Sequence, residues 1–444
     1  MRCLACLTLL CFGLGAGPAA AAGFGLKEHS ADAMAAAYAG AAATDSDASY
    51  LAYNPAAAAG AATTDLAASA VVILPGSRGS YGAATTSAGN PTGGGLSPSG
   101  FISGANVPSF GMRHRLDDRL AFGLDISAPF GLKTDYPATW AGRYYAQKTE
   151  LLTINATPSL AYQLTPALTL GAGLQVEFAQ GTLTSAIDTG TLGAASGIPG
   201  SIPGQQDSFA RLSGKSWSFG YTLGAIARPI PGLTLGLSYH SALGHDLKGP
   251  LTFTLDSAGI GATIRTLTGA LSNTRQTTPV AIPDEVLAGA RLDLSERWTG
   301  MAELDWIDWS RFRELRVIAA NAAQPDDVTT TNWHNTLFGS LGVEYRADSA
   351  FTFRGGVAYD ESPVPDATRE PRIPDADRIW LSAGVRWRMN DNFDLNLTAS
   401  RLFFLASTIA LDPAIPGAAL RGTLAGTTAA YANVAALQLS WRPD

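Results

Sequence analysis

The 444-residue sequence predicts an all-β fold, namely an antiparallel transmembrane β-barrel of about 14 strands with an N-terminal hatch inside its lumen. Apolar and small polar residues alternate along much of the chain, and the connections between the alternating segments are long and short in turn. Charged residues make up only 15% of the sequence, whereas a soluble surface usually needs about a quarter. A barrel explains the low charge and the alternation, because one face of nearly every strand meets lipid.

The alternation is clearest in residues 168–178, 217–225 and 379–387. In the first segment, Thr169, Gly171, Gly173, Gln175 and Glu177 separate Leu168, Leu170, Ala172, Leu174, Val176 and Phe178. A period of two places the two sets on opposite faces of a sheet. Charged members of the polar set should face the lumen, because lipid would penalise them: Asp125, Glu177, Arg291, Asp293 and Arg354.

A β-sandwich would show the same alternation, and the lengths of the connections favour the barrel. Short connections, such as those near residues 115–118, 165–167 and 295–297, alternate with long ones, such as 181–212 and 245–278. An outer-membrane barrel has tight turns at the periplasmic end and long loops outside. Most tryptophans lie near expected strand ends, where aromatic girdles belong: Trp217, Trp298, Trp306, Trp309, Trp380, Trp387 and Trp441.

The first 21 residues resemble a secretory signal peptide. Met1 and Arg2 precede an apolar run over residues 4–14, and small residues 19–22 offer a cleavage site after Ala21 or a neighbouring alanine. All three cysteines, Cys3, Cys6 and Cys11, lie in this segment. We therefore expect an exported protein without disulfides, and we expect no helical span because no apolar run of 18 residues follows.

Residues 22–60 differ from the rest, since they are rich in alanine and do not alternate. Ser30 is placed to cap a short helix, and Asn54, Pro55 and Ala56 suggest a turn. We interpret this segment as a hatch folded inside the barrel, which occupies residues 61–444. The alternative is a flexible periplasmic extension.

Both ends of the mature chain resemble the FadL-type outer-membrane transporters of long-chain fatty acids and hydrocarbons. The motifs that carry this resemblance are Gly23-Phe24, Ala37-Tyr38-Ala39-Gly40, Asp47-Ala48-Ser49, Asn54-Pro55-Ala56, Ile282-Pro283-Asp284-Glu285, Trp309-Ser310, Phe312, Ser362-Pro363-Val364-Pro365 and Ile373-Pro374-Asp375. The resemblance implies a hatched barrel in the outer membrane that passively takes up hydrophobic compounds. It also implies capture by extracellular loops, an inner pocket and lateral release through a kinked strand.

The third strand contains a candidate for the kink. Its alternation runs through Ile126 and is broken by Pro129, Phe130 and Gly131. Proline cannot donate a hydrogen bond to the sheet, and glycine in a strand often marks a bend. The alternative is that the strand ends there.

Two sets of ligand-binding residues follow from the resemblance. Apolar residues of two long loops are candidates for the capture groove: Leu192, Ile198, Ile202, Leu255, Ile260 and Leu267. They could equally pack within the loops. By alignment with the family, Gln180 and His334 occupy the positions that hold basic residues in fatty-acid carriers. Either the alignment is shifted there or the ligand is a neutral hydrocarbon.

The remaining expectations concern chemistry and partners. The five histidines form no H-E-x-x-H motif and the sequence contains no G-x-S-x-G, so we expect no enzyme, no metal and no cofactor. A water-filled porin and, less favoured, an outer-membrane hydrolase remain alternatives. The net charge of −7 argues against a nucleic-acid partner. We expect a monomer in contact with a hydrophobic ligand, outer-membrane lipid and lipopolysaccharide.

Overall fold

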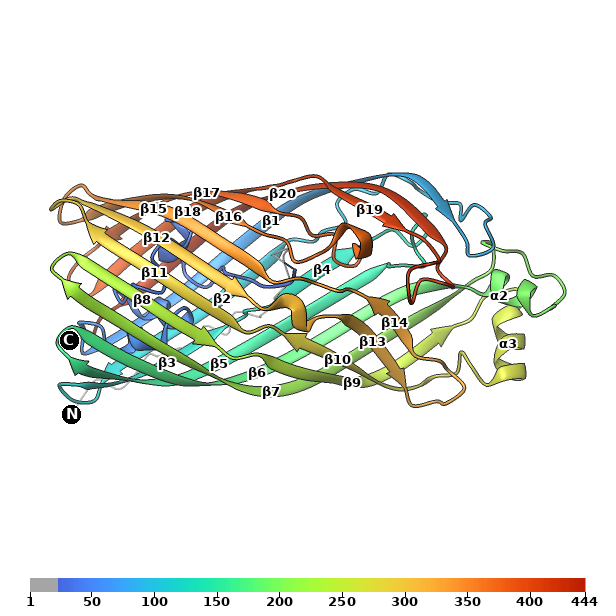
Figure 1. Cartoon of the computed structure of the whole chain (residues 1–444), viewed down its shortest axis with the longest axis horizontal. Coiled ribbons are helices and arrows are strands. Elements are labelled where there is room, and N and C mark those ends of the chain that lie inside the picture. Colours follow the sequence, from blue (N-terminus) through green and yellow to red (C-terminus); the bar gives the residue numbers. More distant parts are fainter. Residues whose placement is uncertain (1–22, 444) are drawn as a thin grey trace, which may run out of the picture.

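The computed structural model describes residues 23–443, and the expected signal peptide lies outside this range. The described residues form a closed antiparallel barrel of fourteen strands (Figure 1). Within residues 23–443, no helix has the length and apolar character needed to cross a membrane. The barrel prediction is confirmed.

Eight of the strands are continuous and six are each interrupted into two segments. In order around the barrel they are β1 (Thr64–Thr85), β2 (Ala105–Arg115), β3 (Leu120–Ser127) with β4 (Gly131–Asp135), β5 (Lys148–Thr165), β6 (Leu168–Asp188), β7 (Asp207–Ile230), β8 (Leu233–His240) with β9 (Leu243–Thr254), β11 (Glu285–Asp293) with β10 (Thr274–Ile282), β12 (Trp298–Ile307) with β13 (Glu314–Ala319), β15 (Thr336–Arg346) with β14 (Asp327–Thr330), β16 (Phe351–Asp360), β17 (Arg378–Arg388), β18 (Phe393–Phe404) with β19 (Ser407–Leu411), and β20 (Thr423–Trp441).

The barrel closes where β1 pairs with β20, from Leu66 opposite Trp441 to Thr85 opposite Thr423. Closure removes the unpaired strand edges that lipid could not satisfy. Several strands extend further than their alternation indicated: β6 and β7 pair up to Asp188 and Asp207, inside the expected loop 181–212. Small and polar residues interrupt the apolar ones in this extension, so its alternation is weaker than in the rest of the two strands.

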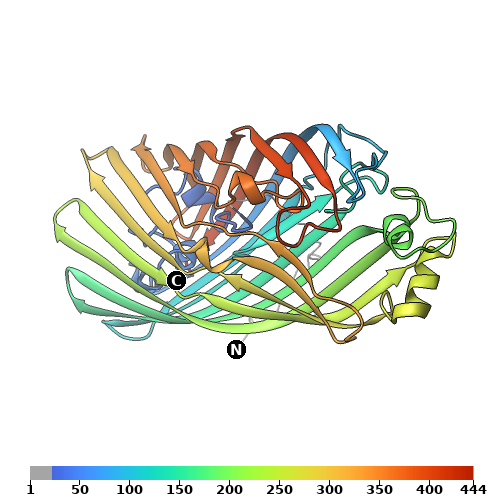
Figure 2. The same cartoon turned by 45° about the vertical axis from the view of Figure 1, so that its right-hand side comes forward.

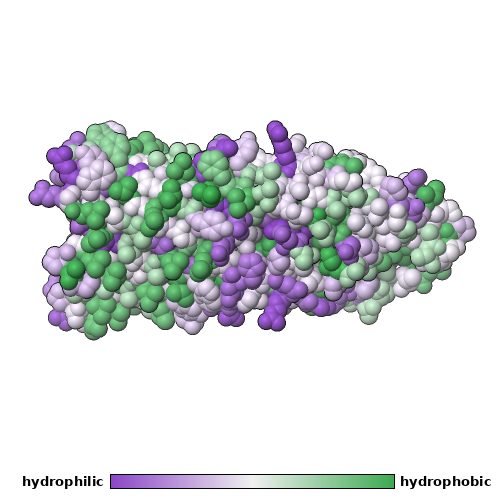
Figure 3. All heavy atoms as spheres, turned by 45° about the horizontal axis from the view of Figure 1, so that its top comes forward, coloured by the Kyte–Doolittle hydropathy of each residue, from purple (hydrophilic) through white to green (hydrophobic). Residues whose placement is uncertain are grey.

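The outer face carries an apolar belt bordered by aromatic side chains. Trp217, Trp298, Trp306, Trp387 and Trp441 are between 37% and 62% exposed on this face. Figure 3 shows apolar groups covering the end of the barrel near the short turns, with hydrophilic groups on both sides. The expectation was wrong for Trp309 and Trp380, which are each 1% exposed and point inward. Trp309 follows the interruption after β12, where the alternation no longer gives the direction of the side chain, whereas Trp380 lies on the inward face of β17 together with Ser382.

The segment expected to form the hatch is described from residue 23 to residue 60 and contains the short elements α1 (Ala31–Met34), η1 (Ala48–Ala52) and η2 (Pro55–Ala59). Ser30 caps α1 by accepting a hydrogen bond from the Ala33 amide at 3.1 Å, and the Asn54 side chain caps η2. Figures 1 and 2 show the hatch within the barrel near the end with the short turns.

Glycines of the barrel wall allow the hatch backbone to come close. A Cβ at Gly236 of β8 would overlap the carbonyl of Ala42, and one at Gly356 of β16 would overlap that of Ala36. Polar contacts add to this packing, since the Asn54 side chain donates to the carbonyls of Ala42 at 2.7 Å and of Ala225 at 3.1 Å. The hatch is therefore held on several sides of the lumen.

Candidate functional site

The wall of the barrel is interrupted between β3 and β4, at Ala128, Pro129 and Phe130. Both segments pair with β5, so one strand continues past the interruption. On the other side, β2 pairs with β3 only over Phe110–Arg115, opposite Ala121–Ile126. The part of β2 from Ala105 to Ser109 pairs with β1 but has no ladder to the kinked strand. The wall therefore has a gap in its hydrogen-bond ladder beside the kink.

The start of the hatch fills the inner side of this gap. The Leu26 amide donates to the Pro129 carbonyl at 2.7 Å, and the Gly131 amide donates to the Phe24 carbonyl at 2.8 Å. Gly25 and Phe130 form an antiparallel bridge between these two bonds. The ladder to β5 stops at Ser127 and resumes at Gly131, so the Pro129 carbonyl is available to the hatch. The hatch thus acts as a short neighbouring strand for the kink.

The Phe24 ring lies at the centre of an aromatic cluster in the lumen. Its centroid lies 4.8 Å from Trp309, 5.5 Å from Phe312, 5.6 Å from Trp333 and 6.0 Å from Phe130. Aliphatic residues of β4, β9, β10 and β12 complete this apolar chamber: Leu132, Leu243, Leu247, Val280, Ile282 and Ile307. The chamber brings the hatch and several distant segments of the barrel together directly behind the kink.

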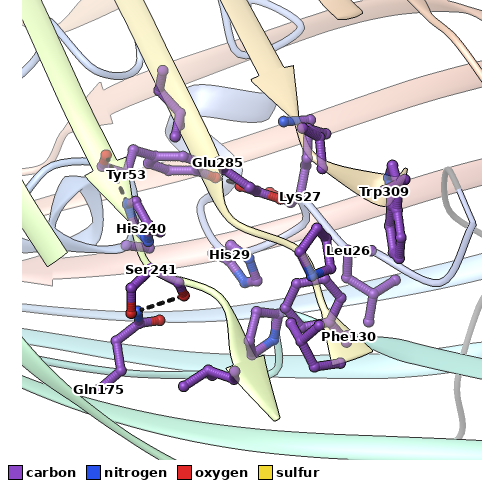
Figure 4. Close-up of a pocket in the computed structure, with 18 of the residues that line it drawn as sticks. Leu26, Lys27, His29, Tyr53, Phe130, Gln175, His240, Ser241, Glu285 and Trp309 are labelled. Carbon is purple, nitrogen blue, oxygen red and sulfur yellow. Dashed lines mark hydrogen bonds between the residues drawn. The ribbon is translucent and has the colours of Figure 1, made fainter. Parts of the chain in front are cut away.

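A small cavity of about 70 Å³ lies between this cluster and the hatch (Figure 4). Its apolar side is formed by Leu26, Phe130 and Trp309. Its polar side contains Lys27, whose ammonium group lies 2.7 Å from the carboxylate of Asp305 on β12. The cavity is therefore amphipathic, and its cation already has a partner.

A larger cavity of about 470 Å³ lies toward the extracellular loops. Its walls are mainly apolar and include Leu183, Leu212, Leu251, Leu315 and Val317 from the upper parts of β6, β7, β9 and β13. Two loop helices, α2 (Thr189–Ala195) and α3 (Ile260–Thr268), cover it and lie at the right-hand end of Figure 1. The cavity is suited to an apolar molecule that enters from outside.

Two arginines from different loops also line the larger cavity. Arg421 pairs with Asp327 at 2.5 Å and with Glu370 at 2.9 Å. Arg372 lies 3.8 Å from Glu370, and its Nη1 has no hydrogen-bond partner among residues 23–443. Burial of the Arg372 guanidinium lowers its pKa, and the carboxylate of Glu370 acts in the opposite direction. Arg372 is thus an incompletely paired cation at an apolar cavity.

A third, narrow cavity of about 20 Å³ lies between the larger cavity and the aromatic cluster around Phe24. It shares Leu315 and Arg372 with the larger cavity and is lined by Phe312 and Trp333 of the aromatic cluster. Apolar side chains therefore line a route from the loops to Phe24 and on to the kink.

The structure contradicts the expected interior positions of Gln180 and His334. Gln180 is exposed on the outer face of β6, between the buried residues Ala179 and Gly181. His334 is also exposed and lines a polar cavity of about 570 Å³ with Glu361 and Asp377, whereas its neighbour Trp333 faces the chamber. A shift of one residue in a strand moves a side chain to the other face, which explains the correction for Gln180. His334 lies in the connection between β14 and β15, where alternation does not apply. The lack of a fixed charge at these positions says nothing about the ligand.

The predicted loop residues divide into two groups. Leu192 lines the larger cavity, while Ile198, Leu255 and Ile260 form a cluster with Leu192 and Ile264 that joins the two loop helices. Ile202 and Leu267 are 49% and 70% exposed and belong to neither. Most of the predicted loop residues therefore belong to the loop helices that cover the larger cavity. Ile260, which is 5% exposed, packs within the loops, as the alternative interpretation expected.

Sequence reasoning did not identify Trp333, Arg372 or Arg421. Trp309, expected in the aromatic girdle, and Phe312 both belong to family motifs, and the structure places both along the route. Arg372 stands directly before the Ile373-Pro374-Asp375 motif, which was the available signal. Arg421 lies in a long loop without any recognisable pattern.

The family model for the outer membrane protein transport protein (OMPP1/FadL/TodX) matches residues 13–442. The long-chain fatty acid transport protein of Escherichia coli K12 is 29% identical over 402 residues, which cover 85% of this chain and 87% of that protein. Outer membrane protein P1 of Haemophilus influenzae is 26% identical over 458 residues and 96% of both chains.

Solved structures share the fold. A Pseudomonas aeruginosa FadL homologue superposes with a TM-score of 0.86 at 24% identity, over 95% of this chain and 100% of that one. The Pseudomonas putida toluene transporter TodX gives a TM-score of 0.68 at 16% identity, again over 95% and 100%. With its family match over almost the whole length, the chain belongs to the OMPP1/FadL/TodX family of outer-membrane transport proteins.

Proposed function

We propose that the protein takes up long-chain fatty acids, or hydrophobic compounds of similar shape, by passive diffusion through the outer membrane. The observation that carries the proposal is the apolar route from the covered loop cavity, past Phe312 and Trp333, to Phe24 and the gap beside β3. Burial of apolar surface makes such a route favourable without an energy source or a chemical step. The relatives named as fatty-acid and toluene transporters support the same class of ligand.

Arg372 is the residue that we assign to a ligand carboxylate. Its guanidinium is 6% exposed, lines the apolar cavity and has a free Nη1 donor among the described residues. Hydrogen bonds between charged groups are roughly twice as strong as neutral ones. A fatty acid could therefore place its carboxylate at Arg372 and its chain against Leu212, Leu251 and Val317.

Binding of oleate and of oleyl alcohol to purified protein separates an anionic ligand from a neutral one. We expect oleate to bind on the order of tenfold more tightly, and Arg372→Gln to remove most of this difference. Arg316→Gln serves as the control, because Arg316 is half-exposed and pairs with Glu314 and Asp326. Equal affinity of the wild-type protein for both compounds would reject the carboxylate assignment and favour a neutral hydrocarbon.

Lateral release through the gap at Pro129, Phe130 and Gly131 completes the proposed route. Release then requires the strand-like contact between the hatch and the kink to open. A Gly25→Cys/Phe130→Cys pair tests this, because bridged residues of antiparallel strands lie roughly 4.5–5.5 Å apart, within disulfide range. We expect the oxidised variant to take up fatty acid more slowly and dithiothreitol to restore uptake. Uptake that does not respond to oxidation, with both single variants as controls, contradicts this step.

We propose further that the hatch, residues 22–60, closes the lumen, and that one chain is sufficient for transport. The support is the packing of Phe24, Asn54, Pro55 and Ala56 against the chamber and the wall. In a planar bilayer the intact protein should conduct little, and deletion of residues 24–40 should raise the conductance. A large steady conductance of the intact protein would favour the water-filled porin. Unchanged conductance of a folded deletion variant would exclude the plug.

A further inference from the structure

The outer face of the barrel carries a cluster of four exposed cations on three adjacent strands: Arg211 and Lys215 on β7, Lys248 on β9 and Arg275 on β10. These strands lie side by side in the lower right part of Figure 1. None of the four has a carboxylate within 4.0 Å among residues 23–443. Asp246, two residues below Lys248, is the acidic side chain on the same face of β9.

The register places two of these cations directly against each other. Lys215 is the cross-strand partner of Lys248, and Arg275 is the partner of Pro250, one outward-facing position above Lys248. Arg211 lies two outward-facing positions above Lys215 on the same strand. Like charges directly opposite each other in a sheet repel, so this arrangement favours a bound anion.

The height of the cluster identifies the kind of anion. Trp217 and Phe219, which are 62% and 68% exposed, face outward directly below Lys215 on β7. Two residues along a strand span about 6.8 Å, so the cations begin one such step above the aromatic border of the apolar belt. This is the level of lipid headgroups in the outer leaflet, on the outside of the wall and away from the ligand route.

We propose that this cluster binds the phosphate groups of an anionic glycolipid of the outer leaflet, which in a bacterial outer membrane is lipopolysaccharide. Lys215 and Lys248 hold one phosphate between them, and Arg275 and Arg211 extend the site upward. The acyl chains lie against Trp217 and Phe219. Gln180, which faces Lys215 across β6 and β7, adds an uncharged hydrogen-bond donor.

Native mass spectrometry of the detergent-solubilised full chain tests the proposal with bisphosphorylated lipid A as the probe. We expect Lys215→Gln/Lys248→Gln to weaken lipid A binding on the order of tenfold, because each surface cation contributes to the attraction of anionic lipid. The charge-preserving Lys215→Arg/Lys248→Arg variant should bind as the wild type does. The matched control is Arg297→Gln/Arg346→Gln, which removes two exposed cations at the periplasmic turns.

Three outcomes would overturn the proposal: unchanged binding by the double glutamine variant, an equal loss in the periplasmic control, or displacement of lipid A by inorganic phosphate at the same concentration. The last outcome would indicate a site for a free anion. Heat-dependent mobility in gels verifies that each variant is folded. Fatty-acid uptake into liposomes should be unaffected, because these four side chains face away from the lumen.

Discussion

Asp32 of the hatch lies between two guanidinium groups of the barrel wall. It pairs with Arg354 of β16 and, at 2.5 Å, with Arg386 of β17, and it accepts a hydrogen bond from the Tyr50 hydroxyl at 2.8 Å. The carboxylate is 1% exposed. Loss of one member of a buried charge group leaves the others without compensation. Asp32 therefore joins the hatch to the wall.

We expect Asp32→Asn to lower the free energy of unfolding by about 3–5 kcal/mol, because two buried arginines lose their shared partner. Urea titration of the folded barrel measures the change. Asp326→Asn is the control, since Asp326 is exposed and its partner Arg316 keeps Glu314. Equal stability of the two variants would show that Asp32 contributes no more than a surface ion pair.

Substitution of Gly236 tests whether the close approach of the hatch backbone to β8 holds the hatch in place. Gly236→Ala should push the hatch away from β8, because the new methyl group overlaps the Ala42 carbonyl. We expect faster hydrogen exchange of the hatch amides than in the wild type. Gly339→Ala makes the same chemical change at a glycine with open space around it and should have no effect on the hatch.

The alternation predicted the direction of most charged side chains and failed near strand ends. Asp125, Glu177 and Arg354 are at most 6% exposed and face the lumen as expected. Arg291 is half-buried and reaches Glu344, whereas Asp293 is exposed at the β11–β12 turn. Gln180 was misplaced by the alignment, because a register error of one residue reverses the face, and His334 lies in a connection without alternation.

At the scale of elements, the kink is the feature that the sequence marked most clearly. Pro129 and Gly131 indicated where β3 breaks, and the structure resumes the strand at Gly131. The partner of the kink could not be predicted, since Phe24 and Leu26 lie about one hundred residues away and their backbone bonds leave no sequence pattern. The same holds for Arg372 and Arg421, which long loops bring to one cavity.

Phe24→Ala tests how far the aromatic cluster holds the hatch against the kink. Removal of this buried ring should loosen the contact, and we expect faster exchange of the Gly131 amide, which donates to the Phe24 carbonyl. Hydrogen exchange followed by mass spectrometry measures it. The matched variant is Phe351→Ala, because Phe351 is 39% exposed on the outer face of β16. Equal exchange at Gly131 in both variants would mean that the backbone bonds hold the kink alone.

At the scale of the whole molecule, the apolar belt fixes the position of the barrel in the outer membrane. Leu341 of β15 is 65% exposed and lies midway between Leu337 and Tyr345, which pair with Trp306 and Trp298 of the two girdles. Low charge and alternation were sufficient to predict this belt. The number of strand interruptions was not predictable, because Pro283 and Asp308–Arg311 bend strands that still pair above and below.

Leu341→Arg should destabilise the folded barrel in lipid by about 2–4 kcal/mol, because the charge lies near the bilayer midplane. Leu294 is equally exposed but lies at the periplasmic turn beside Trp298, so Leu294→Arg should lower the stability by only about 0–1 kcal/mol. Unfolding in phosphocholine vesicles compares the two variants. Equal costs would contradict the proposed depth of the belt.

The contacts of the hatch also determine when the barrel can be assembled. Asp32 pairs with residues of β16 and β17, Asn54 donates to β7, and Lys27 pairs with β12. The hatch therefore contacts strands from the middle and from the end of the sequence. Once β1 and β20 have paired, these side chains have no wide entrance through which to reach their partners. We therefore expect the hatch to enter the nascent sheet before its seam closes. If β1 pairs with β20 first, the barrel closes with the hatch outside its lumen. The sequence of the hatch would then determine what fraction of the chains inserts with the hatch in place.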